Sequence, residues 1–208
     1  MRLQVAIDRV TIEEALKLVN EFDGLADIIE IGTSLIKDYG LLILSKINLN
    51  KNKSLILGDI KTIDEGAYEF EMGYKCGFDI LTVMGNSSLE TIEKCYEVSK
   101  KYNKGIMIDL LECSEYKIRE ISNFKDAIYC IHTSTDKKNK GSFINELEKF
   151  NKEFPHIKHI AVSGGVKLES IEVFKNYNID IVVVGSAITS KENPRDEIKK
   201  FKGEFIWV

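Results

Sequence analysis

Residues 159–189 read HIAVSGGVKLESIEVFKNYNIDIVVVGSAIT and contain the same pattern twice. In each copy a short apolar run ends at a glycine-bearing turn, SGG at 163–165 or GS at 185–186. Continuous apolar runs are typical of strands that are covered on both faces in a parallel sheet. The segment between the turns is long and amphipathic, as expected for a helix. The stretch therefore predicts strands at His159–Val162 and Ile181–Val184, with a helix at Leu168–Tyr177 between them.

The rest of the chain repeats this alternation of apolar runs and amphipathic segments. Further strands are predicted at Leu3–Ile7, Ile28–Ile31, Ser54–Leu57, Ile80–Met84, Ile106–Leu110 and Ala127–Ile131. Polar residues suited to capping begin several helical segments, which predicts helices at Thr11–Phe22, Ser88–Tyr102 and Asn193–Phe201. Eight strand–helix units in 208 residues predict a closed (β/α)₈ TIM barrel, as one domain over residues 1–208. An open doubly wound sheet would need a GxGxxG turn after the first strand, and Asp8-Arg9-Val10 has none.

Composition excludes several classes of protein. The net charge is −4, with no basic face, which argues against a nucleic-acid-binding protein; the KKNK run at 137–140 is typical of a solvated loop. No apolar run has the roughly 18 residues of a membrane span, and MRLQVAIDRV at the start does not resemble a signal peptide. The four cysteines lack CxxC spacing. We therefore expect reduced thiols and a cytoplasmic location.

Polar residues close five of the predicted strands. These are Asp8, Glu30, Asp59, Asp109 and His132. Parallel barrels place their sites at the carboxyl ends of the strands, so these side chains are expected to meet at one rim. The alternative is that each simply caps a helix, but five in corresponding positions favour a site.

The segment Asp59-Ile60-Lys61-Thr62-Ile63-Asp64 is the sharpest of these motifs. Strand alternation predicts that Asp59 and Lys61 point to the same side, into the barrel mouth. Asp64 is expected to begin the next helix, close enough to join them. A lysine between carboxylates stays cationic and is suited to stabilising a developing oxyanion. The alternative is an ion-pair cluster at the start of a helix.

Two further features suggest chemistry at the same rim. Glu30 and Asp59 end neighbouring strands and could share one Mg²⁺, which prefers oxygen ligands; alternatively both carboxylates pair with Lys61. His132 could transfer a proton to or from a bound sugar, or could be structural. His156 and His159 precede a strand and are expected at the opposite end of the barrel.

The two glycine turns predict a phosphate site. Glycines let backbone N–H groups approach a phosphate, and a short helix from Ser186 would add its positive end. With the carboxylates, the lysine and the histidine, this arrangement suits formation of an enediolate from a sugar phosphate.

Eight segments of the chain are similar to those of a known family: LQVAID (3–8), DIIEIGTSLI (27–36), GDIKTIDEG (58–66), LTVMGNSSLETI (81–92), KGIMIDLL (104–111), IHTSTD (131–136), VSGGVKLESI (162–171) and VVVGSAIT (182–189). Together they carry a resemblance to the orotidine 5'-monophosphate decarboxylase superfamily and, within it, the 3-hexulose-6-phosphate synthase family. It implies an Mg²⁺-dependent, reversible aldol condensation of formaldehyde with D-ribulose 5-phosphate, catalysed by an aldehyde-lyase.

The resemblance also implies roles for individual residues. Glu30 and Asp59 would hold Mg²⁺, Lys61 would stabilise the enediolate oxygen, and His132 would remove the C1 proton. Asp8 and Asp109 would bind substrate hydroxyls or position Lys61. The phosphate would be held by Gly165, Gly185 and Ser186. Asp64 would serve the partner's site in a homodimer with shared active sites.

Two relatives and one non-enzyme are the alternatives. Orotidine decarboxylase itself has a lysine where this chain has Glu30, which removes a metal ligand. The family of 3-keto-L-gulonate-6-phosphate decarboxylases shares the enediolate chemistry but typically has a glutamate in place of Asp109 and an arginine in place of Thr135. A non-catalytic sugar-phosphate-binding barrel would tolerate loss of Lys61 or Glu30. The residues present favour the synthase over all three.

Overall fold

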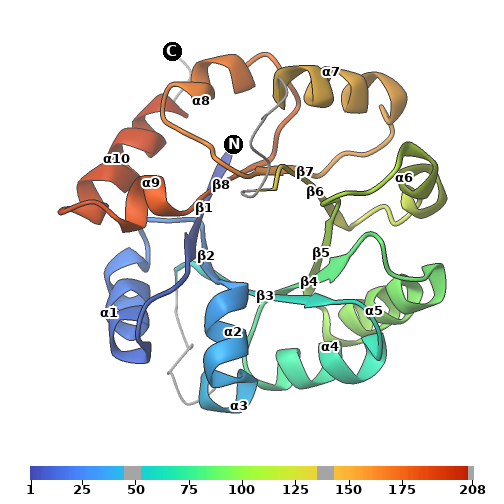
Figure 1. Ribbon diagram of the computed structural model, residues 1–208, viewed down its shortest axis with the longest axis horizontal. Coiled ribbons are helices and arrows are strands. Elements are labelled where there is room, and N and C mark those ends of the chain that lie inside the picture. The colour runs from blue at the N-terminus through green and yellow to red at the C-terminus, as the bar shows by residue number, and fades with distance from the viewer. Residues whose placement is uncertain (45–52, 135–142, 206–208) are drawn as a thin grey trace.

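The computed structural model describes residues 1–44, 53–134 and 143–205. Eight parallel strands form a closed barrel in which each strand pairs with the next in sequence and β8 pairs with β1. Figure 1 shows the strands as a central ring and the helices around it. The strands are β1 (Arg2–Ile7), β2 (Ile28–Ile31), β3 (Leu55–Thr62), β4 (Ile80–Met84), β5 (Gly105–Asp109), β6 (Ile128–His132), β7 (Ile160–Ser163) and β8 (Ile181–Val184). The predicted (β/α)₈ TIM barrel is confirmed.

Helices connect the strands along the outside of the barrel. They are α1 (Ile12–Phe22), α2 (Thr33–Tyr39), α3 (Leu41–Leu44), α4 (Gly66–Lys75), α5 (Leu89–Tyr102), α6 (Glu115–Ile121), α7 (Phe143–Glu153), α8 (Ser170–Phe174), α9 (Ser186–Thr189) and α10 (Pro194–Glu204). No helix among the described residues combines the length and apolar character that a bilayer crossing requires. All four cysteines are free thiols, as expected.

Side-chain caps fix the starts of three predicted helices. Thr11 accepts a hydrogen bond from the Glu14 backbone N–H before α1, and Ser88 accepts one from Thr91 before α5. Asn193 caps α10, whose first residue is proline. Each cap satisfies an amide that the helix itself leaves unpaired, so these boundaries follow closely from the sequence.

The largest differences from the predicted bounds lie at β3, α8 and α10, the last of which continues to Glu204 instead of ending at Phe201. β3 continues to Thr62 instead of ending at Leu57, so Asp59 and Lys61 belong to the strand itself. α8 covers only Ser170–Phe174 of the predicted 168–177 helix. Its flanks form four-residue turns instead: the Ser170 N–H donates to the Lys167 carbonyl, and the Tyr177 N–H donates to the Phe174 carbonyl. These tighter turns end the regular helix on both sides.

The core consists of two apolar clusters on opposite sides of the sheet. The larger lies between the strands and the surrounding helices. The smaller contains side chains that alternate with the first along the strands and therefore face the barrel interior; its members are Ala6, Ile28, Leu57, Ile80, Met107, Ile128, Cys130, Ala161, Ile181 and Val183. These residues form an apolar floor beneath the carboxyl-terminal rim.

Candidate active site

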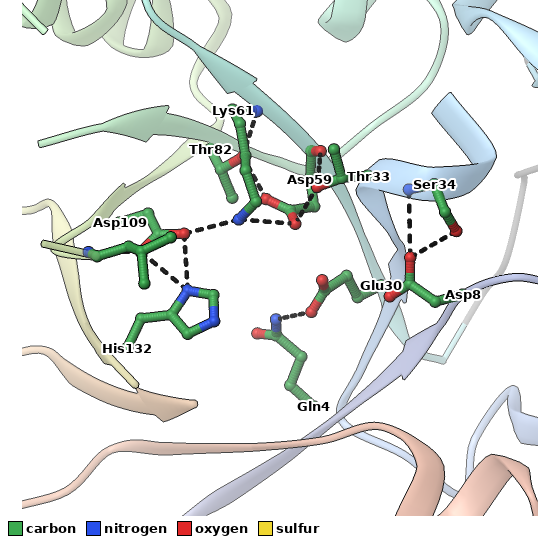
Figure 2. A network of polar contacts seen from close by, with 11 residues as sticks. Gln4, Asp8, Glu30, Thr33, Ser34, Asp59, Lys61, Thr82, Asp109 and His132 are labelled. Carbon is green, nitrogen blue, oxygen red and sulfur yellow. Dashed lines mark hydrogen bonds and ion pairs between the residues drawn. The ribbon is translucent and has the colours of Figure 1, made fainter. Parts of the chain in front are cut away.

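Four strands bring charged side chains together above this floor. Glu30 comes from β2, Asp59 and Lys61 from β3, Asp109 from β5 and His132 from β6. Figure 2 shows Lys61, Asp59, Asp109 and His132 as one continuous set of polar contacts, with Glu30 beside it. The carboxylates are 3–8% exposed. The predicted gathering of polar side chains at one rim is therefore present.

Lys61 lies at the centre of the network. Its Nζ is 2.7 Å from Asp109 Oδ2 and 3.1 Å from Asp59 Oδ2. The predicted proximity to Asp59 is confirmed, but simple strand alternation is not its cause. Lys61 has a left-handed φ of 48°, at a register shift between β3 and β4. Its backbone N–H donates to Thr82 Oγ1 at 2.9 Å, which holds this irregular conformation.

The two carboxylates keep the lysine cationic. Burial by itself would lower the pKa of Lys61, but the charges of Asp59 and Asp109 outweigh burial and raise that pKa above its ordinary value. Burial would likewise raise the pKa of Asp109, yet hydrogen bonding from His132 and the charge of Lys61 lower it to about 2. At neutral pH this part of the site therefore contains a fixed ammonium and a fixed carboxylate.

The ionised Asp109 determines which ring nitrogen of the neutral His132 carries the proton. His132 Nδ1 is 2.9 Å from Asp109 Oδ2 and 3.1 Å from Oδ1. An ionised carboxylate can only accept hydrogen bonds, so Nδ1 must carry the proton in the neutral ring. The lone pair is then on Nε2, the nitrogen that Figure 2 shows turned away from Asp109 toward the space between His132 and Glu30. The imidazole is thus oriented as a proton acceptor.

Asp59 is held by two neutral hydroxyl groups as well as by Lys61. Thr82 Oγ1 donates to Asp59 Oδ1 at 2.8 Å, and Thr33 Oγ1 donates to Oδ2 at 2.6 Å. These contacts fix both carboxylate oxygens without adding charge. Thr82 therefore orients both ends of the Asp59-Ile60-Lys61 segment, through the carboxylate of one residue and the backbone of the other.

Glu30 occupies a different environment. Gln4 Nε2 donates to Glu30 Oε2 at 2.6 Å. Burial and the nearby Asp59 carboxylate raise the pKa of Glu30 to about 8, against a smaller lowering by the Gln4 hydrogen bond. Lys61 also lowers this pKa, but by less than burial and Asp59 raise it. The alternative in which both carboxylates pair directly with Lys61 therefore holds for Asp59 and not for Glu30.

The donor set fits a magnesium ion that keeps most of its ligands as water or substrate. Two buried carboxylates that repel each other are the environment a divalent cation stabilises. Within residues 1–44, 53–134 and 143–205 no cluster of three or more His, Cys, Asp or Glu side chains could hold a metal. Glu30 and Asp59 would thus supply only part of a coordination shell, which suits Mg²⁺ better than a metal that needs four protein ligands.

Asp8 lies at the edge of the site and does not contact Lys61. Its Oδ1 accepts hydrogen bonds from Ser34 Oγ at 2.7 Å and from the Ser34 backbone N–H at 3.2 Å. A Cβ on Gly32 would come within 2.2 Å of Asp8 Oδ2, so this close approach requires glycine. Of the two roles that the resemblance implies for Asp8, only hydroxyl binding is compatible with this position.

The expectation that Asp64 joins Lys61 within the same chain is wrong. α4 begins at Gly66, two residues after Asp64, and the Asp64 carboxylate accepts a hydrogen bond from the Glu65 backbone N–H at 2.8 Å. Among the described residues, Lys61 pairs with Asp59 and Asp109 only. The exposed loop position of Asp64 is set by this local turn.

The glycine turns follow β7 and β8, which are neighbours in the barrel. Gly164 and Gly165 have φ of 99° and 73°, and a Cβ on Gly164 would lie 2.1 Å from the Thr133 carbonyl oxygen. Gly185 precedes α9, which begins at Ser186 as expected. The turn after β7 thus has the close backbone packing that glycine permits, whereas a Cβ on Gly185 would meet only the Ala6 carbonyl oxygen, at 3.8 Å.

Four polar partners were not predicted from the sequence: Gln4, Thr33, Ser34 and Thr82. Alternation could have identified two of them, because Gln4 lies two residues before Ala6 and Thr82 two after Ile80, both inward-facing positions. Thr33 and Ser34 act only through tertiary contacts at the start of α2. His159 lies at the amino-terminal end of β7, as expected. Thr135 and the KKNK run lie outside the described residues.

Comparison with known proteins identifies the family. Residues 1–201 match the model of the orotidine 5'-phosphate decarboxylase / HUMPS family. The chain is 32% identical over 206 residues to 3-hexulose-6-phosphate synthase of Bacillus subtilis, covering 97% of both chains. Its fold matches the crystal structure of 3-hexulose-6-phosphate synthase from Salmonella typhimurium, with a TM-score of 0.90, 28% identity and 98% of both chains covered.

A more distant likeness supports the fold alone. The structure of 3-keto-L-gulonate-6-phosphate decarboxylase from Vibrio cholerae has a TM-score of 0.84 at 20% identity, with 100% of this chain and 99% of that chain covered. Family membership is consistent with the closed barrel, the rim residues and the match over nearly the whole chain. The chain belongs to the orotidine 5'-phosphate decarboxylase / HUMPS family.

Proposed function

We propose that this protein is a 3-hexulose-6-phosphate synthase, an aldehyde-lyase that joins formaldehyde to D-ribulose 5-phosphate reversibly and with Mg²⁺. The observation that carries the proposal is the continuous contact from Asp59 through Lys61 and Asp109 to His132 at the carboxyl ends of β3, β5 and β6. It places a fixed cation beside an oriented base, as proton abstraction next to a carbonyl requires. The family match and the names of the relatives support the same reaction.

His132 and Lys61 would carry out the proton and charge transfers. His132 Nε2 takes the proton from C1 of D-ribulose 5-phosphate, and the electron pair forms a 1,2-enediolate. The Lys61 ammonium stabilises the negative charge that develops on the enediolate oxygen. C1 then attacks the formaldehyde carbon, forming the new carbon–carbon bond, and the formaldehyde oxygen takes a proton back from the His132 imidazolium. Asp109 keeps His132 in the required tautomer throughout.

Glu30 and Asp59 are the residues that would hold the magnesium ion. When bound, Mg²⁺ supplies a Lewis acid for neighbouring substrate oxygens. Thr33 and Thr82 keep the Asp59 carboxylate in place before substrate arrives. The substrate's phosphate would bind at Gly165, Gly185 and Ser186, and Asp8 would accept hydrogen bonds from substrate hydroxyls. These two groups lie on either side of the β8–β1 junction.

The position of Asp64 supports a homodimer with shared active sites. Its carboxylate does not reach Lys61 of its own chain, and it follows the β3 strand in an exposed loop beside Ile63, whose side chain is 57% exposed. A partner would cover this loop and receive Asp64 in its own site. Mixing Asp64→Ala with Lys61→Ala protein should then restore activity in mixed dimers. Verified mixed dimers without any recovery would count against sharing.

The test of the function is formaldehyde consumption by purified protein with D-ribulose 5-phosphate, measured with Mg²⁺ and again with EDTA. We expect consumption that depends on both the sugar phosphate and the metal. Formaldehyde consumption that persists in EDTA would contradict the Mg²⁺ requirement but would still support the condensation reaction. Carbon dioxide release from 3-keto-L-gulonate 6-phosphate, without formaldehyde consumption, would establish the decarboxylase instead. Substrate binding without either reaction would indicate a non-catalytic barrel.

A further inference from the structure

Gln4 is a polar side chain in an otherwise apolar layer of the barrel. It faces the interior from β1, and its partners in register on the neighbouring strands are Ile28 and Val183. Both belong to the apolar cluster inside the barrel. Gln4 is 1% exposed. Packing alone would favour an aliphatic side chain at this position.

The Gln4 carboxamide is only half satisfied. Its Nε2 donates to Glu30 Oε2 at 2.6 Å, while its Oε1 is buried and has no hydrogen-bond partner within the described residues. A buried polar atom without a partner destabilises the folded state. The amide therefore lowers stability at this position, and the one contact it makes is the candidate reason for its presence.

The contact orients Glu30 in a specific way. Figure 2 shows one Glu30 oxygen bound by Gln4 and the other on the side that faces Asp59. An amide donor fixes the first oxygen without adding charge. A lysine or arginine in place of Gln4 would neutralise Glu30 and compete with a bound cation, and an aspartate or glutamate in that place would repel the Glu30 carboxylate. Thr33 and Thr82 also hold Asp59 by neutral hydrogen bonds, but Asp59 has the Lys61 ammonium as a further partner and Glu30 does not.

We propose that Gln4 is a positioning residue for the cation site: it anchors one oxygen of Glu30 from the barrel floor and leaves the other available, opposite Asp59, to a divalent cation. The proposal rests on the magnesium site of the proposed function. It differs from that function in assigning part of the metal affinity to a residue that touches neither the metal nor the substrate.

The test separates metal affinity from stability. In Gln4→Met protein, which keeps the length of the side chain but loses the donor, the Kd for Mg²⁺ should rise about tenfold or more. The measurement is isothermal titration calorimetry with MgCl₂ and no substrate. Urea unfolding in EDTA measures stability separately and should change little, because Gln4→Met removes an unpartnered amide oxygen but also leaves Glu30 Oε2 without its donor. A role limited to packing would lower stability and leave the Kd unchanged.

Two further variants keep the test decisive. Ile28→Val alters packing beside Gln4 without changing a hydrogen bond and should leave the Kd for Mg²⁺ within about twofold, the ordinary result for a change that spares the ligands and their partners. Gln4→Asn retains an amide but is too short to reach Glu30, so it should weaken Mg²⁺ binding even if Gln4→Met does not fold.

The possible failures are distinguishable. Equal Mg²⁺ affinity in the unsubstituted protein and both Gln4 variants would overturn the role of Gln4 and leave the proposed function intact. No Mg²⁺ binding by the unsubstituted protein would remove the metal from the proposed function, and with it any role for Gln4 in positioning a ligand.

Discussion

The two ends of the barrel contain nearly the same trio of residues in different surroundings. At the carboxyl-terminal rim, Asp109 Oδ2 lies 2.9 Å from His132 Nδ1 and 2.7 Å from Lys61 Nζ. At the amino-terminal end, Asp180 Oδ2 lies 3.3 Å from His159 Nδ1 and 2.8 Å from Arg2 Nη2. Each trio is an aspartate, a histidine and a cation. Residue type alone therefore cannot tell a candidate active site from a structural ion pair.

Burial and connection distinguish the two trios. The Asp109 side chain is 4% exposed and that of Asp180 is 29% exposed. Lys61 continues the rim trio to Asp59 and its threonines, beside the Glu30 carboxylate. Both aspartates have lowered pKa values, in each case against the raising effect of burial. Charge in the largely buried, connected network at the rim is available for chemistry, whereas the half-exposed trio ties β1, β7 and β8 together.

Removing the cation from each trio should give the largest contrast. Lys61→Met is expected to lower turnover by about 10²–10³-fold, because the enediolate charge loses its main stabilising group. Arg2→Met should leave turnover within about twofold, since an exposed ion pair contributes at most about 1 kcal/mol. The measurement is formaldehyde consumption with D-ribulose 5-phosphate. Near-normal turnover in Lys61→Met would remove this residue from the mechanism.

Neutralising each aspartate should show how differently the two trios contribute to the pH dependence of stability. The folded-state pKa of Asp109 is about 2, below its ordinary 3.8. The ionised group therefore stabilises the fold above about pH 4, and this stabilisation disappears as the pH falls toward 2. The unfolding free energy of Asp109→Asn should be lower than that of the unsubstituted protein at pH 7, with a gap that narrows from pH 4 to pH 2.

Asp180→Asn provides the matched control for that measurement. The pKa of Asp180 is also lowered, so Asp180→Asn should likewise have a lower unfolding free energy than the unsubstituted protein at pH 7. Because solvent screens this more exposed carboxylate, the difference in unfolding free energy should be smaller than for Asp109→Asn. Urea unfolding at a series of pH values would measure both. A larger gap for Asp180→Asn would show that the amino-terminal trio is the more important for stability. A gap for Asp109→Asn that widens toward pH 2 would contradict the lowered pKa.

The smallest effect is expected from a change near Asp8, which lies just beyond the end of β1 opposite to Arg2. Gly32→Ala would place a Cβ 2.2 Å from the Asp8 carboxylate and force it away from Ser34. If Asp8 binds substrate hydroxyls, the KM for D-ribulose 5-phosphate should rise by about tenfold, equivalent to about 1.4 kcal/mol, with little change in kcat. A normal KM would exclude Asp8 from substrate binding.

The sequence predicted the barrel because its signal is local and repeated. Strands β2, β4 and β8 have the predicted bounds, and the capped starts of α1, α5 and α10 follow from single side chains. Glu30, Asp59, Lys61, Asp109 and His132 were also predicted at one rim. Parallel strands place their carboxyl ends together whatever the loops do, so this part of the site needed no tertiary information.

The rest of the site depends on contacts between distant segments. The left-handed φ of Lys61 depends on Thr82 in the next strand, and the environment of Glu30 depends on Gln4, 26 residues earlier. The turn at Asp64 is local, by contrast: the Asp64 carboxylate accepts a hydrogen bond from the adjacent Glu65 backbone N–H, which the strand–helix pattern does not indicate. Neutral side chains that orient charged ones carry no motif: alternation indicates only that Gln4 and Thr82 face inward, and the fold shows which charged side chains they contact.

Exchange of the C1 protons of D-ribulose 5-phosphate with solvent in D₂O, without formaldehyde, tests whether His132 is the base that forms the enediolate. Proton NMR should show Mg²⁺-dependent exchange in the unsubstituted protein and in His159→Gln, and exchange slowed by at least about 10²-fold in His132→Gln, because only the rim histidine acts as the base. Equal exchange in His132→Gln and the unsubstituted protein would contradict the account.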